Sequence, residues 1–156
     1  MGLDNEIQLI VFKLGNSVYA VDIRNVREVI EAKEVVKLPR APPYIEGIMN
    51  LRGHVVTLVN LAEALGEDGV LGGESEVRKR KVLISMDGDG RNSIGFIVDH
   101  VLGVLRVSSR EVEKPPIDSG GLIKGVVKRG DKLIIVLDLN TLLSEINLTG
   151  LGGGNA

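Results

Sequence analysis

His54 and His100 are the only histidines in the chain, and no cysteine is present to act as a nucleophile or thiolate ligand. Neither histidine stands at a recognisable motif spacing from a serine or a carboxylate. Asp99 and His100 are adjacent on a predicted strand, so their side chains point to opposite faces and form a poor catalytic dyad. No phosphate-binding glycine loop and no metal-ligand cluster appears. We therefore predict a protein that is not an enzyme and has no cofactor; turnover abolished by changing either histidine would support the enzyme alternative.

A predicted hairpin between Gly47 and Leu61 gives the strongest indication of a binding feature. Gly53 can adopt a positive φ at no steric cost, which allows a tight chain reversal next to an arginine. The run Val55 to Val59 is rich in β-branched residues and is typical of a buried strand. Binding residues are commonly presented by turns on such rigid scaffolds, although an ordinary turn with a solvated arginine is the alternative. The candidate interaction residues at this tip are Asn50, Leu51, Arg52 and Gly53.

A second candidate contact surface is a predicted strand that ends near Ile30. On a strand with period two, Val26, Glu28 and Ile30 share one face. A face that is apolar, acidic and apolar in turn favours a contact patch over a core. The alternative is that Glu28 is a solvated residue on a sheet edge.

Two charged segments have weaker functional interpretations. The basic run Arg78 to Lys81 could contact phosphate, but acidic residues precede it and no aromatic residue is interleaved for base stacking. The net charge of −2 gives no basic field for nucleic acid. We therefore predict no nucleic-acid binding and keep a β-barrel nucleic-acid-binding module as a remote alternative, which salt-dependent retention on DNA would support. The acidic turn Asp87 to Gly90 lacks the later ligands of a calcium loop.

The composition limits the class of protein. Only 3% of the 156 residues are aromatic while 44% are hydrophobic, so the core must consist mainly of Val, Ile and Leu, which favours sheets. No apolar run reaches the roughly 18 residues of a membrane span, and Met1 to Glu6 does not have the character of a signal peptide. We expect a soluble cytoplasmic protein without direct membrane insertion.

The local patterns predict a chain made mostly of short strands. Asn60 and Asp138 are expected to cap two short helices, and Gly66 to end the first of them. We expect a flexible tail over residues 151–156. The predicted strands cover residues 7–14, 18–23, about 26–30, 55–59, 82–86, 93–98, 122–127 and 133–137, and the predicted helices cover 61–65 and about 139–146.

The chain also resembles itself. Ile45 to Met49 aligns with Ile123 to Val127, and Val55 to Leu61 aligns without a gap with Leu133 to Leu139. Ala20 to Ile23 similarly matches the four residues that begin at Gly95. The repeat predicts an all-β fold of two five-stranded β-barrels packed on a shared apolar core, because half of the chain is too small to bury a core alone. We expect a single domain over residues 1–150, with subdomains of approximately 15–80 and 81–150 and the N-terminal strand as a candidate for exchange.

An ordered set of motifs runs from about residue 7 to 146. The motifs are Phe12-Lys-Leu-Gly, Tyr19-Ala-Val-Asp-Ile, Val26-Arg-Glu-Val-Ile, Leu38-Pro, Ile45-Glu-Gly-Ile-Met-Asn-Leu-Arg-Gly, Val56-Thr-Leu-Val-Asn-Leu, Gly95-Phe-Ile-Val-Asp and Gly125-Val-Val. In type and order this set resembles the CheW family of chemotaxis coupling proteins. The long segment Gly66 to Lys81 and the glycine-rich tail depart from the family's pattern without touching its motifs.

The resemblance implies two SH3-like barrels and a non-catalytic adaptor. Such adaptors join the regulatory domain of the histidine kinase CheA to the cytoplasmic tips of chemoreceptors, are monomers in isolation and form arrays with their partners. By position, Arg52 corresponds to the family's interaction arginine, and Val26 and Glu28 to its partner-binding strand. An apolar groove between the barrels, with Val98 and Val101 as contributors, would take the receptor tip. The alternative is a CheW-like domain of a larger kinase or of a coupling protein fused to a receiver; the start at Met1 favours a stand-alone chain.

Overall fold

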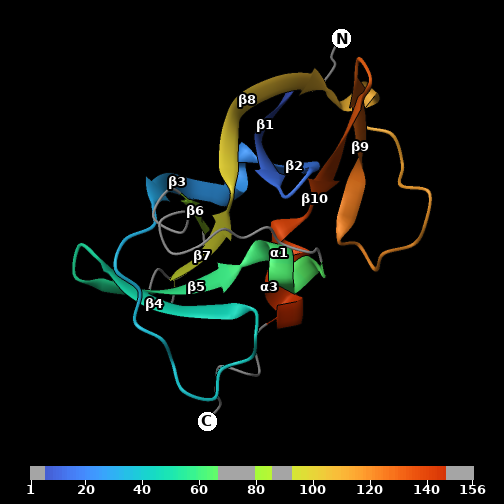
Figure 1. Cartoon of the computed structure of the whole chain (residues 1–156). Coiled ribbons are helices and arrows are strands. Elements are labelled where there is room, and N and C mark those ends of the chain that lie inside the picture. The colour runs from blue at the N-terminus through green and yellow to red at the C-terminus, as the bar shows by residue number, and fades with distance from the viewer. Residues whose placement is uncertain (1–5, 67–79, 86–92, 147–156) are drawn as a thin grey trace.

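The computed structural model describes residues 6–66, 80–85 and 93–146, which form ten strands and four short helical segments (Figure 1). Among the described residues, no helix is long and apolar enough to cross a bilayer. In chain order the elements are β1 (Glu6–Leu14), β2 (Ser17–Asp22), the 3-10 turn η1 (Ile23–Asn25), β3 (Val26–Glu31), β4 (Ile45–Leu51), β5 (His54–Asn60), α1 (Leu61–Leu65), β6 (Lys81–Ser85), β7 (Ser93–Val98), β8 (His100–Ser108), the 3-10 turn η2 (Ser109–Glu111), β9 (Ile123–Arg129), β10 (Lys132–Leu137) and α3 (Leu139–Ile146).

The strands form two sheets of five. Sheet A has the order β8-β1-β2-β10-β9, and sheet B has the order β3-β6-β7-β5-β4. Figure 1 shows sheet A in the upper half of the view and sheet B in the lower half, with α1 and α3 beside each other at their junction. The predicted all-β class with two five-stranded units and short helices is confirmed.

Each sheet is closed by a short bridge beyond its edge strand. The segment that follows β3 pairs with β4 through two backbone hydrogen bonds of 2.8 Å between Val36 and Ile48. The segment that follows η2 pairs with β9 through two bonds of 2.9 Å between Glu113 and Val126. Because these bridges join the two ends of each strand order, the sheets curl into small barrels, which we call barrel A and barrel B.

Buried apolar side chains form three clusters, one inside each barrel and one between them. The cluster between the barrels draws residues from both sheets and both α-helices, including Phe12, Tyr19, Phe96 and Leu139. The rings of Phe12 and Tyr19 stack with centroids 6.2 Å apart. Since hydrophobic burial is the main force that stabilises folded proteins, this shared cluster holds the two barrels together. The predicted shared apolar core is confirmed.

Residues that the internal repeat aligns also form equivalent strand pairs in the structure. The alignment places Leu58 over Val136 and Gly95 over Ala20. In the structure, Leu58 pairs with Gly95 on parallel strands β5 and β7, while Val136 pairs with Ala20 on parallel strands β10 and β2. The two sheets are therefore built to the same plan, with equivalent partners in equivalent registers.

The two sequence repeats nevertheless exchange strands. The first repeat gives β1 and β2 to sheet A and β3 to β5 to sheet B, and the second gives β6 and β7 to sheet B and β8 to β10 to sheet A. The subdomain boundary predicted near residue 80 therefore does not follow the sheets, and the exchange involves both strands of each repeat's first pair. The reason is the parallel pairing of β2 with β10 and of β7 with β5, which links segments distant in sequence.

The predicted helix caps are present. The Asn60 side chain accepts a hydrogen bond of 3.1 Å from the Glu63 backbone N–H, and Gly66 ends α1 at φ 77°. The Asp138 side chain accepts 3.0 and 3.3 Å bonds from the backbone of Asn140 and Thr141. These contacts satisfy backbone donors that a helix start leaves without intrahelical partners. The tail over residues 151–156 lies outside the described residues.

A buried carboxylate stabilises the turn between the two sheets. Asp22 is buried, and its Oδ1 accepts hydrogen bonds of 2.9 and 3.0 Å from the backbone N–H and Nε of Arg24, while its Oδ2 accepts one of 2.8 Å from Nη2. The hydrogen bond from the Arg24 side chain lowers the pKa of Asp22 below its usual value. A lowered folded-state pKa means that this stabilisation is present above the unfolded pKa of about 4 and is lost as the pH falls through the folded value.

Asp22→Asn is therefore expected to lower the free energy of unfolding by about 1 kcal/mol at pH 7, as for the loss of a side-chain cap. The difference from wild type should begin to shrink below about pH 4, where the carboxyl of the unfolded wild-type chain becomes protonated, and should keep shrinking until the folded carboxyl, with its lowered pKa, is protonated as well. Urea unfolding at several pH values checks this, with Asp131→Asn at an exposed site as the control. A difference that stays constant down to pH 3 would show that the charge of Asp22 is not what stabilises the turn.

Candidate protein-interaction site

The β4–β5 hairpin ends in a two-residue turn. Leu51 pairs with His54, so only Arg52 and Gly53 connect the strands, and both have positive φ, 51° and 85°. Two consecutive positive φ values match the type I′ turn, whose twist fits the flanking strands. The Asn50 side chain accepts a 2.9 Å hydrogen bond from the backbone N–H of Gly53 and fixes the loop from within. The predicted tight reversal is confirmed, with an arginine held at its outermost corner.

The four candidate tip residues have different surroundings. Leu51 is 7% exposed and packs inside barrel B with Met49 and Val56, so its side chain anchors the hairpin and does not face a partner. Asn50 and Gly53 are exposed and shape the turn. Arg52 extends outward with 66% of its side chain exposed. Of the four, Arg52 is the one placed for direct contact through a charged group.

Arg52 forms an ion pair with Glu28 of β3, in which Nη2 donates to Oε2. Glu28 lies on β3 and Arg52 directly follows β4, and these strands are the opposite edges of sheet B, so the pair spans the mouth of barrel B. Glu28 is 26% exposed and Arg52 66% exposed, so the pair stands at the surface. An arginine has five N–H donors, and among the described residues only one of those of Arg52 is engaged. The guanidinium is thus oriented by Glu28 and still able to bind a further carboxylate.

Of the predicted common face of Val26, Glu28 and Ile30, the structure keeps Glu28 and Ile30 together, opposite Ile84 and Val82, but places Val26 on the other face. A bulge at Arg27 shifts the register, because Val26 lies opposite Ser85 while Glu28 lies opposite Ile84. An extra residue in one strand reverses the side-chain alternation beyond it. Val26 is consequently buried in the cluster between the barrels, whereas Ile30 packs against the interior of barrel B. Glu28 reaches the hairpin tip because the bulge turns it to the mouth of the barrel.

Val98 and Val101 lie at the junction of the two barrels. Val98 is 0% exposed and belongs to the shared cluster, so it is not available for direct contact with a partner. Val101 is partly buried against the same cluster. Of the two residues predicted for an apolar groove, only Val101 can contribute surface.

The other charged candidates form contacts with residues of the same chain. Arg80 Nη2 lies 3.8 Å from Glu46, and Lys81 Nζ lies 3.2 Å from Glu31, while the rest of the basic run lies outside the described residues. The Asp99 carboxylate accepts a 2.7 Å hydrogen bond from the backbone N–H of Gly15, which fixes the β1–β2 turn. Among the described residues, no group of three or more potential metal ligands is found. The segment from Asp87 to Gly90 lies outside the described residues.

The profile of the CheW-like domain matches residues 8–147, which include both barrels and the hairpin. The chain belongs to the CheW-like domain family. The relatives named chemotaxis protein CheW include two that are more than 30% identical to this chain. The protein from Treponema pallidum is 33% identical over 153 residues, covering 95% of this chain and 88% of the relative. The protein from Thermotoga maritima is 31% identical over 145 residues, covering 92% and 91%.

A solved structure agrees with the CheW-like assignment. The crystal structure of scaffolding protein TtCheW from Thermoanaerobacter tengcongensis matches with a TM-score of 0.76 at 29% identity, covering 94% of this chain and 96% of that chain. The chain is thus a member of the CheW family of chemotaxis scaffolds. Such a scaffold acts through binding surfaces, and the Glu28–Arg52 pair lies within the part that matches the family.

Proposed function

We propose that this chain is a non-catalytic chemotaxis adaptor that couples the cytoplasmic tips of chemoreceptors to the regulatory domain of the histidine kinase CheA. In this proposal the protein is a monomer by itself, is recruited to receptor arrays at the membrane and joins higher-order arrays with both partners. The observation that carries the proposal is the exposed guanidinium of Arg52, held on a rigid turn and oriented by Glu28 within a CheW-like domain.

The kinase contact is assigned to the hairpin tip of barrel B. A guanidinium can form two parallel, charge-assisted hydrogen bonds with a carboxylate, and such bonds are about twice as strong as neutral ones. Because the type I′ turn and Glu28 already restrict Arg52, little additional ordering is needed when a partner binds. The same features would make Arg52 an energetic centre of the interface.

The receptor contact is assigned to the junction of the barrels. A receptor tip is a helical hairpin, and a helix commonly binds through an apolar stripe. Val101 contributes partly buried apolar surface at this junction, and Val104 on the same strand is 56% exposed. The two contacts therefore lie on different elements, β4–β5 for the kinase and β8 for the receptor, as an adaptor requires.

Calorimetry with the CheA regulatory domain and with a soluble receptor-tip fragment tests this proposal. We expect saturable binding of each partner alone and of the second partner to the preformed complex of the first. Light scattering should report a monomer before any partner is added. Failure of a matched kinase domain to bind at concentrations up to about 1 mM would overturn the kinase assignment, and mutual exclusion of the partners would overturn the coupling role.

A further inference from the structure

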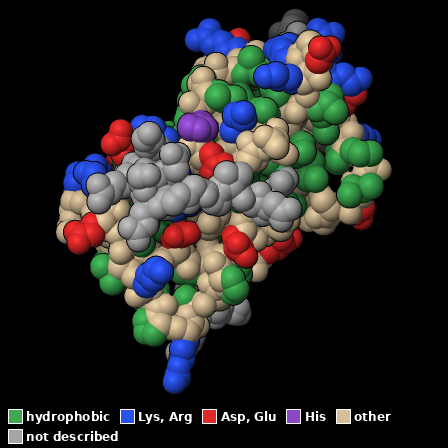
Figure 2. Space-filling view, in the orientation of Figure 1, with side chains coloured by type: hydrophobic (Ala, Val, Ile, Leu, Met, Phe, Trp, Pro, Cys, Tyr) green, Lys and Arg blue, Asp and Glu red, His purple; other side chains and the backbone are tan. Residues whose placement is uncertain are grey.

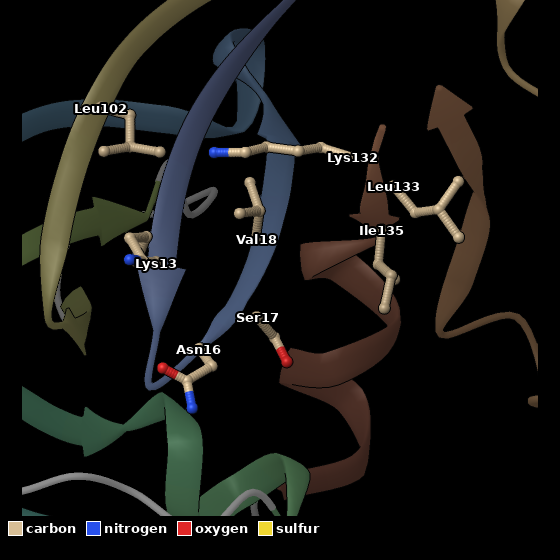
Figure 3. Close-up of a pocket in the computed structure, with 8 residues that line it drawn as sticks. All are labelled: Lys13, Asn16, Ser17, Val18, Leu102, Lys132, Leu133 and Ile135. Carbon is tan, nitrogen blue, oxygen red and sulfur yellow. The ribbon is translucent and has the colours of Figure 1, made fainter. Parts of the chain in front are cut away.

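A pocket of about 500 Å³ lies on the side of barrel A, away from the Arg52 hairpin. It is formed where the β1–β2 turn, the start of β10 and the beginning of β8 meet, and it opens to solvent. Figure 3 shows the Lys132 side chain extending from β10 across Val18 towards Leu102 on β8. The lining residues are Lys13, Asn16, Ser17, Val18, Leu102, Lys132, Leu133 and Ile135.

The two lysines of this pocket are Lys13 and Lys132. Among the described residues, neither Lys13 nor Lys132 forms an ion pair, whereas Lys81 pairs with Glu31 and Lys128 with Glu113. None of the described lining residues carries a carboxylate. Two ammonium groups beside one cavity, with no carboxylate among the described residues of its wall, favour an anionic ligand.

Besides the lysines, Asn16 and Ser17 give the pocket a polar edge, and its other four lining residues are aliphatic. Two of these aliphatic side chains are exposed to solvent, where side chains are usually polar. Leu102 is 56% exposed and Leu133 is 60% exposed. Leu102 is carried outward by a bulge, because Val11 pairs with Gly103 while Phe12 pairs with Val101. Figure 2 shows hydrophobic side chains exposed over sheet A with lysine and arginine side chains among them. A ligand for this site must therefore combine negative charge with aliphatic surface.

At the equivalent place in barrel B, two of the protein's own side chains are hydrogen-bonded to each other. By the repeat alignment, Arg27 corresponds to Leu102 and Ser93 to Val18. Arg27 Nη2 donates a 3.0 Å hydrogen bond to Ser93 Oγ. Barrel A has apolar residues at both positions and cannot make that bond. Because the two barrels have the same strand arrangement, the fold does not require apolar residues at these positions of barrel A.

We propose that the barrel A pocket binds an extended, acidic and leucine-containing segment of a protein partner. One carboxylate of the segment lies between Lys13 and Lys132, and flanking aliphatic side chains cover Leu102 and Leu133. The two exposed leucines lie on different strands, β8 and β10, so a peptide that crosses the pocket covers both, whereas a small anion covers neither. A nucleic acid is disfavoured because the pocket has no aromatic side chain for base stacking. The site lies on the other barrel from Arg52, so it does not depend on the kinase assignment.

The test uses the full chain and three short labelled peptides in which leucine alternates with glutamate, glutamine or lysine. We expect saturable binding of the glutamate peptide with a Kd below about 1 mM, and methyl NMR shifts at Val18, Leu102, Leu133 and Ile135. Replacing both pocket lysines, Lys13→Gln with Lys132→Gln, should weaken binding about fivefold. The matched control Lys33→Gln with Lys37→Gln removes the same charge from exposed sites and should change the affinity less than about twofold.

Each other outcome contradicts the proposal. Equal effects of the two double variants would reduce the binding to general electrostatic attraction. Equal binding of the glutamine peptide would remove the need for the lysines. Acetate producing the same methyl shifts at similar concentration would make the pocket a small-anion site, and the absence of shifts in the wild-type chain would exclude the site, whatever the variants do.

Discussion

Replacing Gly47 with alanine is expected to lower the free energy of unfolding by about 3 kcal/mol, because the added methyl group would meet both backbone strain and crowding. Gly47 has φ 149°, a conformation that residues with a side chain rarely adopt, and a Cβ there would stand 2.3 Å from the carbonyl oxygen of Val36. That oxygen accepts the 2.8 Å hydrogen bond from Ile48 that closes barrel B. The methyl group would therefore strain the backbone and push apart the bridge.

Two other glycines allow the effect of backbone strain to be separated from the effect of crowding. A Cβ on Gly125, which the repeat aligns with Gly47, would stand 2.6 Å from the oxygen of Glu113, so Gly125→Ala should cost about 2 kcal/mol through crowding alone. A Cβ on Gly53 would meet nothing within 4 Å, so Gly53→Ala at φ 85° should cost about 1 kcal/mol through strain alone. Urea unfolding measures all three, and thermal midpoints should fall by about 3 °C per kcal/mol. A value for Gly47→Ala no larger than that for Gly53→Ala would show that the closing bridge is not rigid.

This pair of glycines also shows how much of the fold the sequence could predict. Gly47 and Gly125 fall together in the internal alignment because both barrels need close backbone approach at the same step of the fold. Strand patterns, helix caps and equivalent registers were therefore predictable. The assignment of strands from each repeat to the two sheets was not predictable, since the parallel pairs β2–β10 and β5–β7 join segments distant in sequence. Alternation of apolar and polar residues shows that a strand face is buried but does not show which strand lies beside it.

The candidate site was predictable in the same partial way. The turn at Arg52 and Gly53 follows from residue type, because glycine favours positive φ. The bulge at Arg27 has no comparable local signature, so the sequence analysis placed Val26 and Glu28 on one face and did not pair Glu28 with Arg52. Strand β8 beyond His100 was not predicted either, since its residues alternate between exposed and half-buried and only Val107 is fully buried. Its exposed leucine at the bulge became evident only in three dimensions.

Arg52→Ala is expected to weaken binding to the CheA regulatory domain about thirtyfold, equivalent to about 2 kcal/mol, while changing the free energy of unfolding by less than about 0.5 kcal/mol. Stability should be nearly unaffected because the pair with Glu28 is exposed, and exposed ion pairs contribute little. Arg40 provides a matched control, since it is also an exposed arginine with positive φ, 63°. Arg40→Ala should leave the affinity unchanged, and similar losses of binding and stability in Arg52→Ala would make Arg52 a structural residue.

Glu28→Gln tests whether the ion pair prepares Arg52 or competes with the partner. If Glu28 orients the guanidinium, Glu28→Gln should weaken kinase binding about fivefold and have no further effect in the Arg52→Ala background, which gives a coupling of about 1 kcal/mol. If Glu28 must be displaced before a partner carboxylate can bind, the same change should strengthen binding. Calorimetry on the four proteins of this double-mutant cycle distinguishes the two. We expect weakening, because the remaining N–H donors of Arg52 can reach a partner while the bond to Glu28 stays in place.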